Sequence, residues 1–471
     1  MTVILMAVMM MGVNAAPEIK WVSKNEPVGT ATAAVYSDGY VFVTEGTALG
    51  EYDVSDPQNP IKVKSLPILG GYQAQRLAVR GKYLFVGCAH VIRVYDISDK
   101  SNPIDIAGFR HANAYCQGIS VDDNYLYVCA HSNGLKILRA SDAELDAMSR
   151  ETPGGLTAVY APANRAIGVT TAQYLKDGML YVCTNPGAAD INAAFMVYDV
   201  SEAAAPKLKG YCELKHIGNP SKGLRMSSIA LKGNYAYVGT NDAQAQTTTS
   251  GASNGIYVFD VSSAKNNTSD TPVIMNYINL VQIENINYPR RISGLLAYGD
   301  YLIANDQDSQ CIRLYSIKNP ASPIQIAAVK TQSGEKNGAI ASAINDNMIY
   351  VADNSAGFGI YKISGEDILL SAIKNGEEVY EIEDGEIYAK AKISNFTAAP
   401  KKCSLILAVY NGGKLEECKA IWNTDIPAAT EGYEITTDAA EIPMLHDGYS
   451  IKIFTVDGGG ALRPLGDILE R

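Results

Sequence analysis

One two-part segment recurs seven times along the chain, and this repetition constrains the fold more than any single residue does. Each copy has an apolar run introduced by a turn and then a second apolar run, which in four copies ends in Asp-x-Ser. In the second copy the two parts are Tyr83-Leu-Phe-Val86 and Val94-Tyr-Asp-Ile-Ser98. Repeats of roughly 40 to 50 residues made only of strands are typical of a β-propeller, where each sheet packs against two neighbours. We therefore predict an all-β fold with a seven-bladed β-propeller over residues 16–365.

The repeats also predict how each sheet is built. In the second copy we expect four strands, at Arg76–Val79, Tyr83–Cys88, Val91–Ile97 and Ile104–Phe109. The last copy lacks a fourth strand, and Glu18–Ser23 has strand character without a preceding repeat, so we expect this segment to complete the last sheet. The repeated aspartates precede a serine and a turn, which predicts a turn-capping role; they are Asp53, Asp96, Asp199 and Asp260.

The two ends of the chain read differently from the repeats. Residues 1–15 form a short apolar run that ends in Val13-Asn14-Ala15, which predicts a cleaved signal peptide, although the usual basic start is missing. From about Gly365 short strands alternate with turns such as Asn411-Gly-Gly413. This pattern predicts an immunoglobulin-like or fibronectin-like β-sandwich over residues 366–471.

Composition excludes several classes of partner. The formal net charge is −11 with no lysine- or arginine-rich run, so we expect no nucleic-acid partner. No later segment has the length and apolarity of a membrane helix, so we expect no membrane insertion. Of the eight cysteines, those inside the repeats resemble small core residues. Cys403 and Cys418 are the one pair that we consider for a disulfide.

The repeats resemble a known family. Ile229-Ala-Leu-Lys-Gly-Asn-Tyr-Ala-Tyr-Val238 followed by Gly255-Ile-Tyr-Val-Phe-Asp-Val-Ser262 is similar to LVIVD repeats, which form propellers in bacterial secreted and surface proteins. The resemblance covers residues 18 to 365 and implies the fold, but no shared catalytic residues. The tail, with Tyr449-Ser-Ile-Lys-Ile-Phe-Thr-Val456, resembles accessory sandwich modules of secreted clostridial proteins. The two resemblances imply an extracellular or cell-surface location in a Gram-positive, anaerobic type of organism.

Topology predicts where a binding site would lie. Loops that enter the first strands and loops between the second and third strands share one face of a propeller. On that face we expect the ligand-binding residues, which are Arg76, His90, His111, Tyr115, His131, Arg225, Arg290 and Arg291. Arginines gathered there would bind an anion or a carbohydrate through bidentate hydrogen bonds. The alternative is that each arginine pairs with a neighbouring aspartate and joins adjacent blades.

Cofactor signals are weak. His90 and His131 occupy comparable loops and could approach each other, but surface histidines fit the pattern better than metal ligands. Asn305-Asp-Gln-Asp308 resembles a calcium loop only loosely, because it lacks the glycine and final glutamate of an EF-hand. We therefore predict no cofactor and no metal site, with structural calcium as the remaining alternative.

We predict a secreted or cell-surface binding protein whose propeller loops engage a glycan or a protein, with the sandwich as spacer or attachment module. No His-Glu-x-x-His, Cys-x-x-Cys or phosphate-loop motif occurs, and the Gly-x-Ser-x-Gly spacing occurs only at Gly251–Gly255, in a loop and not in a strand-to-helix turn, so we assign no catalytic residue. One alternative is a polysaccharide lyase or hydrolase that uses Arg76, His111, Tyr115 and Arg291 in the channel. A second is a structural surface-layer component. The sequence leaves the oligomeric state open.

Overall fold

The computed structural model is almost entirely β-structure. It describes residues 18–25, 29–111, 115–148, 154–162, 169–185, 193–216, 219–240, 254–282, 291–331, 338–364, 366–379, 382, 385–395, 400–428, 430–442, 449–457 and 469–470. The chain divides into two compact units, one of which is Trp21–Lys362 while the other includes Ile363–Arg471. The predicted signal peptide, residues 1–15, and Arg290 lie outside the described residues. No helix in the described part is both long enough and apolar enough to cross a membrane.

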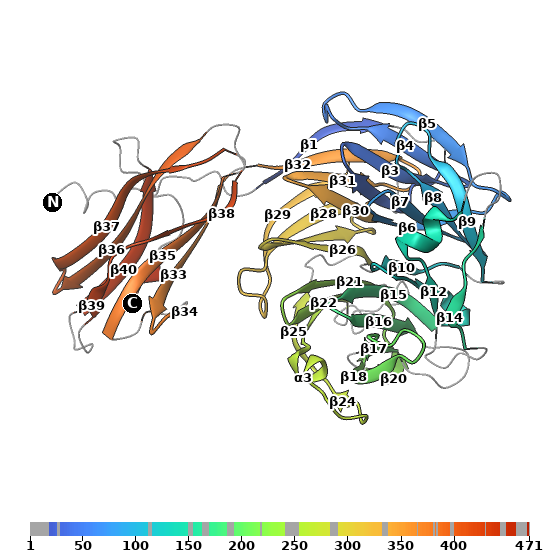
Figure 1. Ribbon diagram of the computed structural model, residues 1–471. Coiled ribbons are helices and arrows are strands. Elements are labelled where there is room, and N and C mark those ends of the chain that lie inside the picture. The colour runs from blue at the N-terminus through green and yellow to red at the C-terminus, as the bar shows by residue number, and fades with distance from the viewer. Residues whose placement is uncertain are drawn as a thin grey trace. The chain divides into compact units, whose positions relative to one another are not determined.

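The described strands of Trp21–Lys362 form seven small sheets in chain order, numbered here from first to seventh (Figure 1). The first three sheets contain β2 (Ala34–Ser37), β3 (Tyr40–Glu45), β4 (Ala48–Asp53) and β5 (Ile61–Pro67), then β6 (Ala74–Arg80), β7 (Tyr83–Cys88), β8 (Val91–Asp96), β9 (Ile104–Arg110) and β13 (Gly154–Gly155), then β10 (Gly118–Val121), β11 (Tyr125–Cys129), β12 (Leu135–Arg139) and β14 (Ala158–Tyr160).

The next three sheets contain β15 (Val169–Lys176), β16 (Met179–Asn185), β17 (Ala194–Asp199), β18 (Lys207–Glu213) and β24 (Val273–Ile274), then β21 (Met226–Lys232), β22 (Tyr235–Thr240), β23 (Gly255–Asp260) and β25 (Tyr277–Gln282), then β26 (Ile292–Tyr298), β27 (Tyr301–Asp306), β28 (Cys311–Ser316) and β29 (Ile324–Lys330). Outside these sheets lie a two-stranded pair and three short helices, which are β19 (Lys215–His216), β20 (Asn219–Gly223), η1 (His131–Asn133), α2 (Asp142–Asp146) and α3 (Ser262–Lys265).

The seventh sheet takes one strand from the start of the chain. Its strands are β30 (Ala341–Asn345), β31 (Met348–Ala352), β32 (Phe358–Ser364) and β1 (Glu18–Asn25), in the order β1-β32-β31-β30. The prediction that Glu18–Ser23 completes the last sheet is therefore confirmed. The first strand of each sheet contacts the first strand of the next, and β30 also contacts β2.

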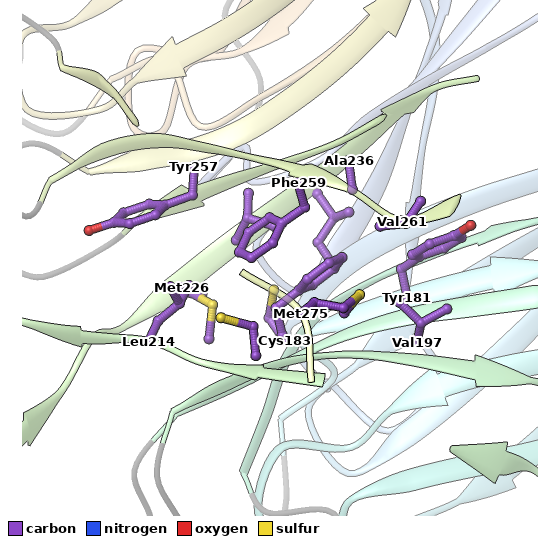
Figure 2. Packing of buried hydrophobic residues seen from close by; sticks show 14 of the residues in the cluster. Tyr181, Cys183, Val197, Leu214, Met226, Ala236, Tyr257, Phe259, Val261 and Met275 are labelled. Carbon is purple, nitrogen blue, oxygen red and sulfur yellow. The ribbon is translucent and has the colours of Figure 1, made fainter. Parts of the chain in front are cut away.

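Hydrophobic clusters lie between successive sheets, because each sheet is apolar on both faces. The cluster between the fourth and fifth sheets combines Tyr181 and Val197 with Tyr257 and Phe259 (Figure 2). The rings of Phe195 and Phe259 meet across this gap, with centroids 4.7 Å apart. Such aromatic pairs contribute about 0.5–1.5 kcal/mol beyond the area they bury.

One position near the end of the second strand holds a small residue in several sheets. In β7 this residue is Gly87, and a Cβ there would overlap the side chain of Cys116 from the third sheet. In β22 it is Gly239, where a Cβ would lie 2.7 Å from Ile292 of the sixth sheet. Cys129 occupies the matching position in β11. The small residues let neighbouring sheets approach closely, which confirms that this cysteine serves as a small core residue.

The repeated aspartates cap turns, as the sequence predicts. Each accepts a hydrogen bond of 2.8–2.9 Å from the backbone N–H of the serine two residues later, at Asp53, Asp96, Asp199 and Asp260. Hydrogen bonds from the backbone and side chain of Ser55 hold the pKa of Asp53 below its usual range, and hydrogen bonds from the side chain and backbone of Ser201 do the same for Asp199. The short helix α2 follows the third strand of the third sheet, and a reciprocal capping box between Ser141 and Glu144 begins it.

The second unit has two sheets that share one core. One is ordered β34-β33-β35-β38 with β39 on β35, and the other is ordered β37-β36-β40-β41. Ile387 and Ala389 of the first sheet pack with Leu407 and Ile453 of the second. Their bounds are β33 (Glu366–Lys374), β34 (Glu377–Val379), β35 (Gly385–Asn395), β36 (Lys401–Asn411), β37 (Lys414–Ile426), β38 (Thr430–Thr436), β39 (Ala440–Ile442), β40 (Tyr449–Asp457) and β41 (Leu469–Glu470).

The disulfide considered for the second unit does not form. Cys403 and Cys418 are both free thiols. The strand register separates them, because Cys403 lies opposite Thr424 and Cys418 lies opposite Ala408. The sequence left this pairing open, because sequence spacing alone does not fix the register between β36 and β37.

Candidate functional site

Four aromatic side chains from two neighbouring sheets form a continuous series, which we call the aromatic row: Tyr72, His90, Tyr115 and His131. Ring centroids are 6.0 Å apart for Tyr72 and His90, 6.5 Å for His90 and Tyr115, and 6.4 Å for Tyr115 and His131. Tyr115 is 51% exposed, and the other three are partly exposed. A half-exposed tyrosine ring between two imidazoles offers both an apolar face and polar edges.

The loops that carry the row follow from the repeat. Tyr72 and Tyr115 stand in the loops that enter β6 and β10, and His90 and His131 stand in the turns after β7 and β11. The sequence predicted that His90 and His131 could approach each other. The structure places Tyr115 between them, so their common neighbour is a phenol ring.

Both histidines of the row have left-handed backbone conformations. The φ angle is 72° at His90 and 41° at His131. The corresponding turns of other sheets place Gly46 and Asn354 at positive φ, and these are the residue types that the left-handed region favours. The second and third sheets instead carry an imidazole where the backbone alone favours glycine or asparagine.

His111 lies beneath the row and not in it. Its side chain is 4% exposed, and Nε2 is 3.2 Å from the carbonyl oxygen of Cys88. Burial lowers its pKa, so the ring is neutral at pH 7 and Nε2–H donates to that carbonyl. Its backbone N–H donates to the carbonyl of His90, and its carbonyl accepts from Asn133. His111 therefore joins the two histidine-bearing turns.

The loop that carries Tyr115 is held by buried contacts. The backbone N–H of Cys116 donates a 2.9 Å hydrogen bond to Oε1 of Gln75. The Cys116 side chain fills the space left by Gly87. Burial raises the pKa of the Cys116 thiol to about 12, so the thiol is protonated and not nucleophilic at neutral pH. Its role here is to anchor the loop.

Arg76 reaches the same loop from β6. Its Nε donates to the carbonyl of Gln117 at 3.0 Å, and its Nη1 donates to the carbonyl of Gln75 at 2.8 Å. Burial lowers the pKa of its guanidinium, although an arginine keeps its charge in proteins. The structure thus brings one predicted arginine to the loop that carries Tyr115.

The other predicted arginines have different surroundings. Arg291 precedes β26 and pairs with Asp308 of its own sheet, with Nε and Oδ1 2.8 Å apart. Arg225 is exposed and precedes β21. Arg291 therefore pairs with an aspartate, as the alternative interpretation of the sequence expected. The pair lies within one sheet, however, and does not join two sheets.

The residues of the loose calcium pattern have other partners. Asp306 accepts hydrogen bonds from Nε and Nη2 of Arg313, and Asp308 binds Arg291. Asn305 bonds to Ser342 of the seventh sheet. Across the described residues, no three His, Cys, Asp or Glu side chains are grouped so that they could hold a metal ion.

Sequence reasoning missed Tyr72. Its signal was available, because Gly70-Gly71-Tyr72 precedes β6 in the same loop class that supplied Tyr115. The contact with His90 depends on how the loop folds back over the turn, and no spacing rule shows that.

Comparison with known proteins supports the repeat assignment. The LVIVD repeat model matches residues 70–107, 114–143 and 225–244, and the first two ranges contain the aromatic row. A comparison with curated proteins found no match. Among solved structures, the computationally designed Ika8 protein is 9% identical, with a TM-score of 0.45 over 73% of this chain and 100% of that chain. A likeness at this level has no bearing on function.

Proposed function

We propose that the seven sheets are the blades of a closed β-propeller and that residues 366–471 form an immunoglobulin-like sandwich. Three observations support the ring: the contacts between successive first strands, the contact of β30 with β2, and the N-terminal strand β1 in the seventh sheet. A closed ring leaves no sheet without two neighbours. The shared core of the two C-terminal sheets supports the sandwich.

On this scaffold the protein is a secreted or cell-surface binding protein, and its aromatic row is the contact site for a glycan. The observation that carries this proposal is Tyr115, half exposed between His90 and His131. A sugar ring has an apolar C–H face that stacks on a phenol ring, and its hydroxyls can bond to flanking imidazoles. A protein partner with an exposed aromatic or aliphatic side chain is the second candidate for the same surface.

The catalytic alternative has less support. A lyase or hydrolase site would need His111 or Tyr115 as a base beside stabilising arginines. His111 is buried with Nε2 bonded to a backbone carbonyl, and Arg291 is paired with Asp308. The geometry therefore favours binding without turnover.

The test is a glycan panel with three forms of the protein. Tyr115→Ala should weaken the affinity for the bound glycan at least about tenfold, since truncating a central aromatic contact residue costs on the order of 2 kcal/mol. Tyr277→Ala is the matched control, because Tyr277 is 42% exposed on the fifth sheet. Absence of any glycan or protein ligand for the wild type, or full affinity in Tyr115→Ala, would overturn the proposal.

A further inference from the structure

Arg76 differs from the other arginines in the described part of the chain. Five of them have a carboxylate within ion-pair distance, namely Arg80, Arg93, Arg139, Arg291 and Arg313. Two more, Arg110 and Arg225, are exposed to solvent. Arg76 is half-buried, and no carboxylate among the described residues pairs with it.

Such a charge is costly unless something compensates it. Removing a guanidinium from water without a counter-ion is unfavourable, and carbonyl oxygens offset only part of the cost. The guanidinium has five N–H groups, and the described hydrogen bonds use Nε and one N–H of Nη1. The edge formed by Nη2 and the second N–H of Nη1 has no acceptor in the described structure, and a planar carboxylate matches that edge.

The position of this edge links it to the aromatic row. The acceptor of Nε is the carbonyl of Gln117, two residues beyond Tyr115. Gln75, next to Arg76, holds the N–H of Cys116. Strand β6 is thus bonded twice to the loop that presents Tyr115, so the guanidinium is held against the segment that directly follows the exposed ring.

We propose that the ligand of the aromatic row is an acidic glycan and that Arg76 binds the carboxylate of a uronic-acid residue stacked near Tyr115. This inference rests on the proposed function and narrows it to one class of substrate. On a chain of net charge −11, a preformed cationic site beside the row selects an anion that the rest of the surface repels.

The experiment compares oligogalacturonate, its methyl ester, a sulfated oligosaccharide and a neutral oligogalactoside by titration calorimetry. The wild type should bind oligogalacturonate at least tenfold more tightly than its methyl ester, and added salt should reduce this preference. Arg76→Gln should abolish the preference, and Arg76→Lys should keep part of it. Arg139→Gln is the control, because Arg139 is an exposed arginine at the far end of β12.

The outcomes separate the two proposals. Equal affinity for oligogalacturonate and its methyl ester, or a retained preference for the acid in Arg76→Gln, overturns the inference about Arg76. The proposed function still stands in that case if glycan binding depends on Tyr115. Tighter binding of the sulfated sugar than of the carboxylate also overturns it. If no glycan binds and Tyr115→Ala changes nothing, both proposals fail. Thermal unfolding of Arg76→Gln and Arg76→Lys identifies any loss that comes from misfolding.

Discussion

The hydroxyl of Ser23 donates a 2.6 Å hydrogen bond to the carbonyl oxygen of Pro57. Ser23 belongs to β1 of the seventh sheet, and Pro57 lies between β4 and β5 of the first. Two further contacts join these sheets: Ala31 bridges Asn354, and the rings of Tyr36 and Tyr350 stack with centroids 5.7 Å apart. The two ends of the repeat array therefore meet through hydrogen bonds as well as apolar packing.

This junction predicts a measurable contribution to stability. Ser23→Ala should lower the free energy of unfolding by about 0.5–1.5 kcal/mol, because it leaves a backbone carbonyl without its partner. Ser98→Ala is the control, since Ser98 is exposed and uses its backbone N–H in the turn. Chemical denaturation measures both variants. Equal stabilities for the two would show that the Ser23 bond does not contribute.

Glu51 predicts a pH-dependent stability. It lies in β4 where other third strands carry Val94, Val258 or Leu314. Its carboxyl oxygens have no hydrogen-bond partner in the described structure. Burial raises the pKa of Glu51 to about 7; the charge of Asp99 also raises it, while those of Lys64 and Lys100 lower it.

The sign follows from the two states. Between pH 4.5 and 7 the folded state keeps the proton and the unfolded state loses it, so stability falls as pH rises across this range. In Glu51→Gln this dependence should vanish. The free energy of unfolding of Glu51→Gln, taken relative to that of the wild type, should rise by about 1–3 kcal/mol as the pH is raised from 4.5 to 8. Urea unfolding at several pH values measures this difference. If the unfolding free energies of the two proteins change with pH in parallel, the prediction is contradicted.

Gly87 should not tolerate a side chain. Gly87→Ala forces the Cys116 side chain away and should destabilise the protein by about 1–3 kcal/mol through overpacking. Gly155→Ala is the control, since a Cβ at Gly155 meets nothing within 4 Å. Adding Cys116→Ala to Gly87→Ala should restore part of the loss. No recovery in the double variant would place the strain elsewhere.

The buried pair of Arg313 and Asp306 should be sensitive to the loss of one partner. Asp306 is fully buried, and Nη2 of Arg313 lies 2.9 Å from its Oδ2. Asp306→Ala should cost about 3–5 kcal/mol, because it leaves an uncompensated charge. Asp425→Ala breaks an exposed pair with Lys402 and should cost at most about 1 kcal/mol. Similar losses in thermal unfolding would contradict this contrast.

Thiol labelling tests the state of the cysteines. Seven of them are buried and Cys418 is exposed, so a thiol reagent should modify Cys418 first in the native protein. Burial keeps the others protonated, with the pKa of Cys88 at about 12. All eight should react after denaturation without reductant. A smaller number would reveal a disulfide.

The sequence by itself determined the local structure. Short continuous apolar runs between turn signals specify strands within a residue or two, as in Tyr83–Cys88, which matches β7. Asp96 caps its turn through a partner two residues away, a contact that needs no tertiary context. Only the tertiary structure decided that Tyr115 lies between His90 and His131. It also decided that Arg291 pairs with a carboxylate, whereas no carboxylate of the described residues pairs with Arg76. The residues in these contacts come from loops of different sheets or from turns that are far apart in the chain. The packing of side chains, and not residue spacing, therefore sets the distances between them.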